Sequence, residues 1–343
     1  MKNNIRRIIY AMLLGVFVYA GFAIYTGIDK MGEALSHYRW HTFALACTFA
    51  FGNYVLRFFK WEFYLARLEI RGIPKLDSFL TFLSGFVLTV TPGKVGEIFK
   101  SLVLHEIHGV PMTKTAPIVV AERATDVIGI VILIVIGSLG FSGGLVWAGI
   151  GAGLVAVLLI VVSNKTLSLG IVRLVAKMPG RIGKMAPKLE AMVESLAMML
   201  KPKNLVLPSL ISLGAWMLEC LALWIILDGF GANIDVKRCT FFYATSTLAG
   251  AVVPVPGGLG VTESALMGQI TEFGHVEKSA AAAAMILVRF STLWFAVLVG
   301  FIALTVLKRI HPGLLRDVKD LKEAKEAAAK EDAAKEAAAA GET

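Results

Sequence analysis

Charged residues are scarce in this chain. They make up 17% of the 343 residues, whereas hydrophobic residues make up 57% and the mean hydropathy is +0.72. Soluble domains contain about 25% charged and about 45–50% apolar residues. A water-soluble globule of this size has too little interior to bury so much apolar surface. The composition therefore excludes a soluble enzyme, a DNA-binding domain and, for most of the chain, disorder.

Cysteines and enzyme motifs are also scarce. Cys47, Cys220 and Cys239 are an odd number and lie far apart, which excludes a disulfide framework and gives no metal-ligand spacing. The chain has no Walker A sequence and no HExxH motif. The short loops leave no room for a catalytic domain outside a membrane. We therefore expect no catalytic residues, no metal, no cofactor and no ATP-driven pumping.

The excess of basic residues is unevenly distributed. The net charge is +9, but the segment 317–343 contains five lysines and eight acidic residues. In so apolar a chain, we expect the remaining basic excess to face anionic lipid headgroups and not nucleic acid. The predicted partners are therefore membrane lipids, with a second copy of the chain or a lipid-synthesis enzyme as further candidates.

Six apolar stretches reach the ~20 residues that a helix needs to cross a membrane. Between the fourth and fifth of them, lysines and arginines alternate with apolar residues at helical spacing, which predicts amphipathic helices on the membrane surface. The Ala/Glu/Lys-rich end has no apolar stripe, and we expect a frayed, exposed helix there. The predicted spans are 8–27, 42–67, 115–140, 143–162, 204–230 and 279–307.

Two further apolar stretches are too short to span. Residues 79–91 and 241–253 each cover about 20 Å as helices, and each ends at a Pro-Gly sequence that another short helix follows. Proline and glycine break helices, and broken backbone at membrane depth needs cover from protein or a water-filled cavity. We therefore predict two re-entrant hairpins, 77–107 and 240–271. Their tips contain Pro92, Gly93 and Gly96 in the first and Pro256, Gly257 and Gly260 in the second.

The two hairpins resemble each other in sequence. The first tip reads TPGKVGEIFKS and the second PVPGGLGVTES, and in both a glutamate follows the glycines. From Glu97 to Arg123 is 26 residues, and from Glu263 to Arg289 is also 26. This match predicts an internal repeat. The expected divisions are 1–41 (first span and outer loop), 42–140 (repeat unit one), 141–203 (fourth span and basic linker), 204–310 (repeat unit two) and 311–343 (charged tail).

The distribution of basic residues predicts the orientation. The segments that share the side of the N-terminus hold most of the lysines and arginines, which favours that side as the cytoplasm. Both termini are then cytoplasmic in a multi-pass protein of the inner cell membrane, and the two units have opposite orientations. The expected fold is an all-α polytopic membrane protein with about six spans and two re-entrant hairpins in an inverted repeat, an architecture of many secondary transporters.

Ionisable residues inside the apolar segments predict the functional site, because each costs about 2.5–3.5 kcal/mol on insertion scales. Arginines near helix starts are suited to a phosphate or another anionic headgroup. The acids could neutralise these arginines in the empty site or carry a coupling proton. The same residues also fit purely structural pairs, and Lys60 with Glu62 fits side chains that reach the membrane surface. The candidate binding residues are Arg57, Lys94, Glu97, Glu122, Arg123, Asp126, Glu219, Glu263 and Arg289.

Four segments together resemble the lysylphosphatidylglycerol synthase transmembrane-region family, also called flippase-like domain proteins. They read NYVLRFFKWEFYL, TPGKVGEIFKSLVL, ERATDVIGI and PVPGGLGVTESAL, and the resemblance covers roughly residues 5–310. It implies movement of a lipid between leaflets, for example an aminoacylated phosphatidylglycerol or another anionic or polyprenyl-linked lipid. The chain lacks the soluble aminoacyl-transferase domain of the synthases, so the resemblance does not imply lipid synthesis.

Three functions compete on this basis. The first is a lipid transporter whose polar cavity, between the repeats, receives an anionic or polyprenyl-phosphate-type lipid. The second is an integral membrane enzyme that acts on a lipid-linked substrate, with the carboxylates as acid and base. The third is a scaffold for envelope lipid synthesis that transports nothing. We expect the first.

Overall fold

The computed structural model describes residues 15–90, 97–141, 146, 149–150, 153, 195–253 and 255–314. Over these residues the chain is helical and forms no strand. An apolar helix, Gly15–Thr26, comes first. The elements that follow are α2 (Ile28–Ser36), α3 (Trp40–Arg67), α4 (Lys75–Ser84), the 3-10 segment η1 (Gly85–Leu88), α5 (Phe99–His108), α6 (Met112–Ser138), α10 (Pro202–Gly229), α11 (Val236–Val252), the 3-10 turn η4 (Pro256–Gly258), α12 (Val261–Glu272), α13 (Lys278–Arg289), the π-helical η5 (Phe290–Trp294) and α14 (Phe295–Ile310).

Three stretches in the described part of the chain are long and apolar enough to cross a membrane. They are Trp40–Arg67, Lys203–Gly229 and the continuous run Lys278–Ile310. Helix α6 has 27 residues and at 1.5 Å per residue is about 40 Å long, but it carries three charges within five residues. The chain is therefore a membrane protein with three clear spans, and the six predicted spans stay a prediction beyond these. Within the predicted span 143–162 and the linker 163–203, only residues 146, 149–150, 153 and 195–203 are described, and residues 315–343 lie outside the described part of the chain.

Helix boundaries follow from residues that stop or start a helix. Pro202 occupies the first turn of α10, where a missing N–H costs nothing. Asp235 caps α11, because its carboxylate accepts a hydrogen bond from the Lys237 backbone N–H at 3.2 Å. Gly109 ends α5 in the left-handed conformation (φ 68°). The Asp235 cap explains why α11 begins at Val236 and not at 241, where the apolar stretch begins.

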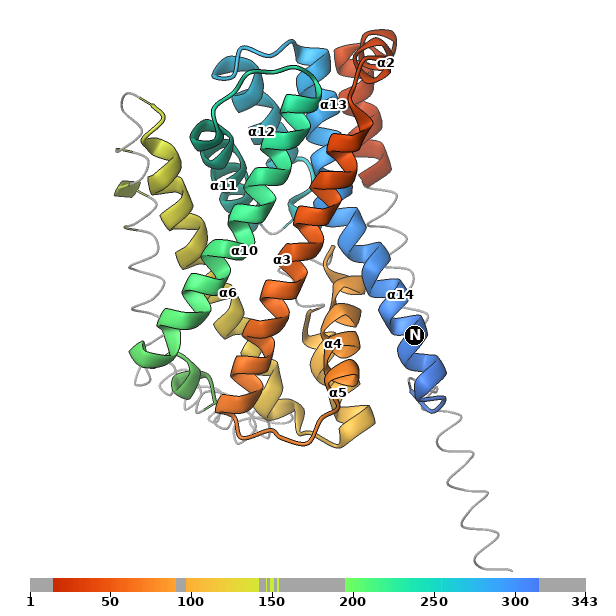
Figure 1. Cartoon of the computed structure of the whole chain (residues 1–343), viewed down its shortest axis with the longest axis vertical. Helices are drawn as coiled ribbons and strands as arrows, with labels where there is room; N and C mark the ends of the chain where they lie inside the picture. The colour runs from red at the N-terminus through yellow and green to blue at the C-terminus, as the bar shows by residue number, and fades with distance from the viewer. Residues whose placement is uncertain are drawn as a thin grey trace, which may run out of the picture.

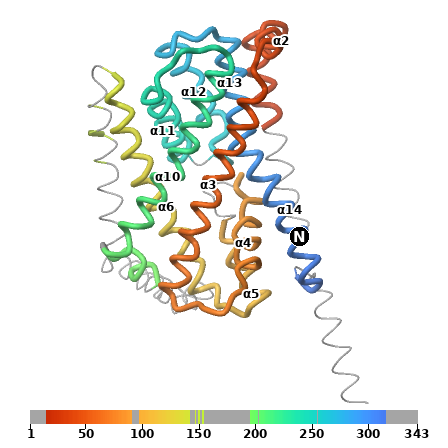
Figure 2. The backbone as a smooth tube through the Cα atoms, viewed as in Figure 1, coloured from red at the N-terminus to blue at the C-terminus, as the bar shows by residue number. Residues whose placement is uncertain are grey.

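Helices α3 and α10 pack side by side at the centre of the bundle and run in opposite directions (Figures 1 and 2). Their contacts are reciprocal. Leu218 of α10 packs over Gly52 of α3, and Leu56 of α3 packs over Gly214 of α10. At both places a glycine of one helix therefore lets a leucine of the other approach closely.

Other helices from the first half of the sequence also pack against helices from the second half. Helix α6 packs against α11, and α14 packs against α4 and η1. Both contacts are close. A β-carbon on Gly137 of α6 would lie 2.6 Å from the Phe241 backbone nitrogen, and one on Gly300 of α14 would lie 2.7 Å from the Val87 backbone nitrogen. The long helix α6 of the first half therefore packs against α11 of the second half, and α14 of the second half packs against α4 of the first.

The helix pairs α4–α5 and α11–α12 lie at opposite ends of the bundle. In Figure 1, α4 and α5 flank the lower half of α3, whereas α11 and α12 lie beside the upper half of α10. The first pair differs from the predicted stretch 79–91, because α4 begins directly after Pro74 and tightens into η1 before Val90. The second tip lies against Val90, the last described residue after η1: a β-carbon added to Gly257 would lie 3.1 Å from Val90 Cγ1.

The buried apolar side chains form two main clusters, one in each half of the bundle. The upper cluster joins α10, α11 and α13, and it includes Leu223, Phe242 and Met285. The lower cluster joins α3, α4 and α14, and it includes Trp61 and Phe82. The charged residues described next are buried beside these apolar clusters.

Candidate functional site

The first group of buried charges centres on Glu97, which stands just before α5. Arg57 of α3 places Nη2 3.8 Å from Glu97 Oε1, and Arg123 of α6 places Nη2 3.1 Å from Glu97 Oε2. The side chains of Arg57 and Glu97 are 9% and 4% exposed. One carboxylate therefore joins two arginines from two different helices. We call Arg57, Glu97 and Arg123 the arginine pair site.

A lysine lies buried beside this site. Lys60 is one turn beyond Arg57 on α3, and its Nζ lies 2.6 Å from Asp126 Oδ1. Nζ also donates to Ser212 Oγ of α10 at 2.7 Å. Asp126 turns its other oxygen, Oδ2, toward Arg123 Nη2 at 2.9 Å. The carboxylate of Asp126 thus joins Lys60 to the arginine pair site.

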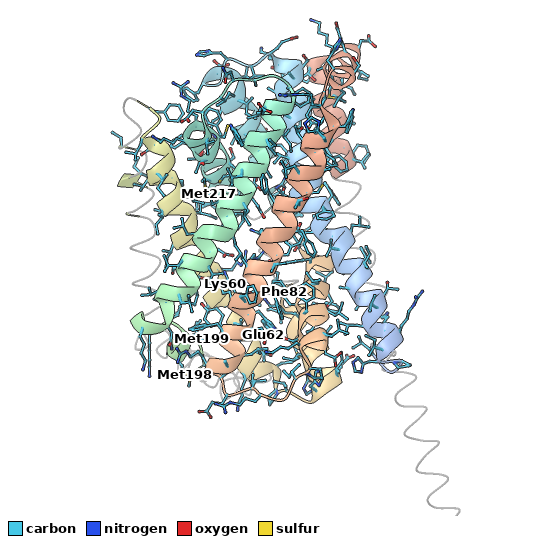
Figure 3. All side chains as sticks on the ribbon, in the orientation of Figure 1. Lys60, Glu62, Phe82, Met198, Met199 and Met217 are labelled. Carbon is cyan, nitrogen blue, oxygen red and sulfur yellow. The ribbon has the colours of Figure 1, made fainter. Side chains whose placement is uncertain are left out.

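Lys100 of α5 forms the next buried pair, with Glu122 of α6. Its Nζ also lies 4.6 Å from the ring centre of Trp61 and 5.2 Å from that of Phe82. Aromatic faces attract cations, so the ammonium group has favourable contacts on more than one side. Figure 3 shows Lys60 inside the bundle at the level of Phe82, while Glu62 lies nearer the end of α3.

Glu219 lies between the two halves of the bundle. It occupies α10, is buried, and accepts a hydrogen bond from Tyr243 Oη of α11 at 2.7 Å. It is close enough to Arg123 to interact with it electrostatically. Tyr243 in turn lies within electrostatic range of Arg289. Glu219 therefore neighbours Arg123 on one side and, through Tyr243, the Arg289 region on the other.

The second tip has its own ion pair. Arg289, the last residue of α13, places Nε 2.6 Å from Glu263 Oε1 and donates from Nη2 to the Gly257 carbonyl oxygen at 2.7 Å. Glu263 Oε2 accepts from the backbone N–H of Gly260 at 2.8 Å, which caps α12. Gly257 and Gly260 have φ values of 62° and 85°, a region that favours glycine. This tip is therefore fixed by an arginine, a carboxylate and two glycines.

The sequence-predicted residues thus fall into two groups. Arg57, Glu97, Arg123, Asp126 and Glu122 come together around α3 and α6, and Glu219 lies close to them. Glu263 and Arg289 form a separate pair with Pro256, Gly257 and Gly260 nearby. Arg289 shares no carboxylate with Arg57 or Arg123 in the described contacts. Lys94, Pro92, Gly93 and Gly96 lie outside the described residues.

Lys60 and Lys100 are the main additions that the structure makes. Lys60 has no exposed surface, so the reading of it as a side chain that reaches the membrane surface is wrong. Lys60 lies one helical turn after Arg57, and this spacing is the sequence feature that could have placed Lys60 in the arginine pair site. Glu62 behaves differently, because it pairs with the exposed Lys75 and accepts from Ser78. Ser212 carries no sequence signal, since one more serine in an apolar helix is unremarkable.

The arginine pair site retains unused hydrogen-bond donors. Arg57 Nε and Arg123 Nε are buried and have no hydrogen-bond partner among the described residues. The Arg57 contact with Glu97, at 3.8 Å, is longer than a charged hydrogen bond of about 2.7–2.9 Å. Buried polar groups are normally paired, so a buried donor without a described partner is a candidate contact for a ligand. The described residues hold no group of three His, Cys, Asp or Glu side chains placed to bind a metal ion.

Comparison with known proteins identifies the family. A UPF0104 membrane protein of Methanocaldococcus jannaschii is 26% identical over 231 residues, which cover 65% of this chain and 95% of that protein. A second one from the same organism is 21% identical over 329 residues, or 90% and 97% of the two chains. One from Methanothermobacter thermautotrophicus is 30% identical over 111 residues, 32% of each chain. Residues 12–300 match the family described as the lysylphosphatidylglycerol synthase TM region, and the chain belongs to that family.

Proposed function

We propose that this protein moves a lipid with an anionic headgroup, such as a phospholipid or a polyprenyl phosphate, between the leaflets of a membrane. The observation that carries the proposal is the arginine pair site. Two guanidinium groups from α3 and α6 share one carboxylate, and the Nε atom of each has no hydrogen-bond partner among the described residues. Arginine is suited to phosphate because its planar fork donates two parallel hydrogen bonds.

Burial of these charges supports a function beyond stability. A buried ion pair is weak evidence for stability, because its desolvation cost can exceed its Coulombic gain. Ionisable groups within membrane segments commonly mark substrate or ion pathways. Here four cations and several carboxylates gather where α3, α6 and α10 meet the start of α5.

The arrangement of helices supports transport by an inverted repeat. The Gly52–Leu218 and Gly214–Leu56 contacts are reciprocal, and an Arg–Glu pair stands at each tip region. We infer that α4–α5 and α11–α12 are re-entrant hairpins that enter from opposite faces and meet near the membrane centre. Alternating access then consists of motion of one unit against the other around a fixed site.

The proposal includes a location and an orientation. The end of α3 with the loop after it, the start of α10 and the end of α14 lie at the lower end of the bundle in Figure 1. These segments contain Arg67, Arg71, Lys201 and Lys308, which favours this end as the cytoplasmic one. The protein is then a multi-pass protein of the inner cell membrane with both termini inside. It is a transporter and not an enzyme, and its partners are lipids, with a second copy or a lipid-synthesis enzyme as an associated protein.

Sealed vesicles that contain the purified chain test this proposal. A fluorescent phosphatidylglycerol is added to one leaflet, and its movement to the other is followed with a quencher that does not cross the membrane. Transfer of the unchanged lipid, faster than transfer of a matched phosphatidylcholine, supports transport. A chemically altered lipid would instead support the function of a membrane enzyme. Vesicles in which the lipid is neither moved nor altered would support the function of a scaffold that transports nothing.

Substitution of the arginines locates the site. Arg123→Ala is expected to weaken lipid binding by a factor of roughly ten to a hundred, since one charged hydrogen bond contributes about 1.5–3 kcal/mol. Arg123→Lys should restore part of it, because an ammonium group cannot form the planar fork. Arg39→Ala is the matched control: Arg39 pairs with Asp228, and both side chains are nearly half exposed. If the folded Arg57→Ala and Arg123→Ala proteins bind lipid as the parent does, this site is wrong.

A further inference from the structure

The long apolar run Lys278–Ile310 changes its helical geometry at one place. Helix α13 ends at Arg289, the π-helical turn η5 covers Phe290–Trp294, and α14 begins at Phe295. Among the described residues, η5 is the one π-helical turn. Such turns are rare, and they occur frequently at functional sites. A geometry so uncommon needs support from the residues that pack around it.

The two parts of this run bind different units of the protein. Arg289 of α13 pairs with Glu263 and donates to the Gly257 carbonyl oxygen of the second tip. Helix α14 packs against α4 and η1, where a β-carbon on Gly300 would lie 2.7 Å from the Val87 backbone nitrogen. In Figure 1, α13 lies in the upper half of the bundle and α14 runs into the lower half. A motion of one unit against the other therefore has to be taken up between Arg289 and α14, which is where η5 lies.

Tyr54 of α3 supports the turn from outside the run. Its hydroxyl group donates to the Thr292 carbonyl oxygen at 2.9 Å, and the residue is only 2% exposed. Its ring packs against Phe86 of η1 and Phe295 of α14, with centroid distances of 4.9 and 6.1 Å. A buried tyrosine normally needs a hydrogen-bond partner for its hydroxyl group, and Tyr54 finds this partner in η5. Tyr54 therefore attaches α3 to the middle of the π-helical turn.

This hydrogen bond lies one helical turn from an arginine of each buried site. Tyr54 is three residues before Arg57 on α3, and Thr292 is three residues after Arg289. Tyr54 also lies within electrostatic range of Arg57. From α11, Tyr243 lies close to the Thr292 hydroxyl group. The helix that carries Arg57 is therefore tied directly to the turn that follows Arg289.

We propose that Tyr54 is a positioning residue for lipid movement: its hydrogen bond to the Thr292 carbonyl holds η5 in the geometry that keeps Arg289 at the second tip while α14 stays on α4 and η1. This proposal rests on the proposed function. A π-helical turn differs from an α-helical turn by one residue in register, and one residue rotates an α-helix by about 100°. A change between the two geometries would therefore rotate α13 against α14 and carry Arg289 away from Glu263. In this role Tyr54 touches no lipid, so its hydroxyl group acts on the rate of movement and not on the affinity for the headgroup.

Tyr54→Phe tests the role of the hydroxyl group. The variant keeps the aromatic ring but cannot donate to Thr292. In the sealed vesicles that test the proposed function, the rate of phosphatidylglycerol transfer should fall about two- to tenfold, as expected for the loss of one neutral hydrogen bond. The Kd of the purified variant in detergent for dihexanoyl phosphatidylglycerol should equal that of the parent. A contact that only stabilises the fold would not separate the rate from the Kd in this way.

Tyr38→Phe is the matched control. Tyr38 is a buried tyrosine just before α3, and its hydroxyl oxygen accepts a hydrogen bond from Thr42 Oγ1 at 2.7 Å. The control also loses one buried hydrogen bond of a tyrosine hydroxyl group, but none to η5. Its transfer rate and its Kd should both equal those of the parent.

The geometry of the run can be measured directly. Spin labels on Lys278→Cys and Arg309→Cys, two exposed positions near its ends, should lie roughly 45 Å apart. A background of Cys47→Ala removes the half-buried native thiol. Double electron–electron resonance should give the same distance distribution for the parent and for Tyr38→Phe, and a broader or shifted one for Tyr54→Phe. In the parent, lipid should also change the distribution, because η5 adapts as the two units move.

The outcomes separate this proposal from the proposed function. If folded Tyr54→Phe transfers lipid at the rate of the parent, the positioning role is overturned and the lipid site stands. A Kd that rises as much as the rate falls would place Tyr54 in lipid binding and overturn the positioning role equally. If the parent transfers no anionic lipid, both proposals fail. Where Tyr54→Phe does not fold, the parent's distances decide: a distribution that lipid leaves unchanged overturns the role of η5.

Discussion

At the scale of residues, Lys60 shows how the structure uses a charge inside a membrane protein. Its ammonium group has no contact with solvent, yet Asp126 and Ser212 lie within 2.7 Å of it. Three helices supply these groups, α3, α6 and α10. The pair therefore links helices that are far apart in the chain, and its loss should be felt as a loss of stability.

A double-mutant cycle measures this link. Lys60→Met leaves part of Asp126 uncompensated, and removal of one member of a buried pair costs about 3–5 kcal/mol. Lys60→Met combined with Asp126→Asn should recover part of that loss, with a coupling energy above about 1 kcal/mol. The readout is the free energy of unfolding in detergent. The same cycle on the exposed pair Arg39 and Asp228 should give less than about 1 kcal/mol, and equal values for both cycles would contradict the prediction.

The sequence indicates part of this site but not all of it. Equal spacing of 26 residues marks Glu97 with Arg123 and Glu263 with Arg289, because a repeat leaves the same interval in both units. The Lys60–Ser212 contact joins positions 152 residues apart. No helical period connects such positions, and only the packing of α3 on α10 brings them together. The separation of Arg289 from Arg57 and Arg123 is also a tertiary property, since depth along a helix does not fix which neighbour a side chain meets.

At the scale of elements, helix length and helix boundaries could be predicted to different degrees. The ends of α3 and α10 lie within about two residues of the predicted spans, because long apolar runs determine them. Helix α11 extends five residues further back than its apolar stretch, since a capped, basic first turn has no hydrophobic signal. The π-helical turn η5, directly after Arg289, has no recognisable sequence pattern. Its Thr292 carbonyl accepts a hydrogen bond from Tyr54 Oη of α3 at 2.9 Å.

The contact of α14 with η1 gives a prediction about packing. Gly300→Ala would place a β-carbon 2.7 Å from the Val87 backbone nitrogen, so we expect a loss of about 1–3 kcal/mol from overpacking. Gly268→Ala is the matched control, because no atom lies within 4 Å of its added β-carbon. In the exposed interior of α12, alanine should instead add about 0.5–1 kcal/mol. Thermal unfolding in detergent measures both, and a Gly300→Ala protein as stable as the parent would show that the helices are not in close contact.

At the scale of the whole molecule, α4–α5 and α11–α12 lie at opposite ends of the bundle. The loops beside these two helix pairs should therefore lie on opposite faces of the membrane. Arg71 precedes α4, and Lys278 begins α13; both are exposed. The loops that contain them lie at opposite ends of the bundle in Figure 1. A membrane that surrounds the bundle along this axis therefore separates them.

Thiol labelling of intact cells tests that separation. In a Cys47→Ala background, which removes the one half-buried native thiol among the three cysteines, Lys278→Cys should react with a reagent that does not cross the membrane. Arg71→Cys should react only after the membrane is opened, because the basic loops favour the cytoplasm. Labelling of both positions from one face would rule out the proposed inverted arrangement.

The crossed packing of the two halves has a consequence for synthesis of the chain. The ribosome completes α4 at Ser84, but its partner α14 begins only at Phe295. During that interval α4 has to be sheltered by lipid, by the insertion machinery or by a chaperone, because its final neighbour does not yet exist. Lys60 of α3 likewise has no partner until α6, which carries Asp126, has been synthesised. We therefore expect a nascent chain stopped before α14 to be held at the insertion site or degraded, since its first half cannot mature alone.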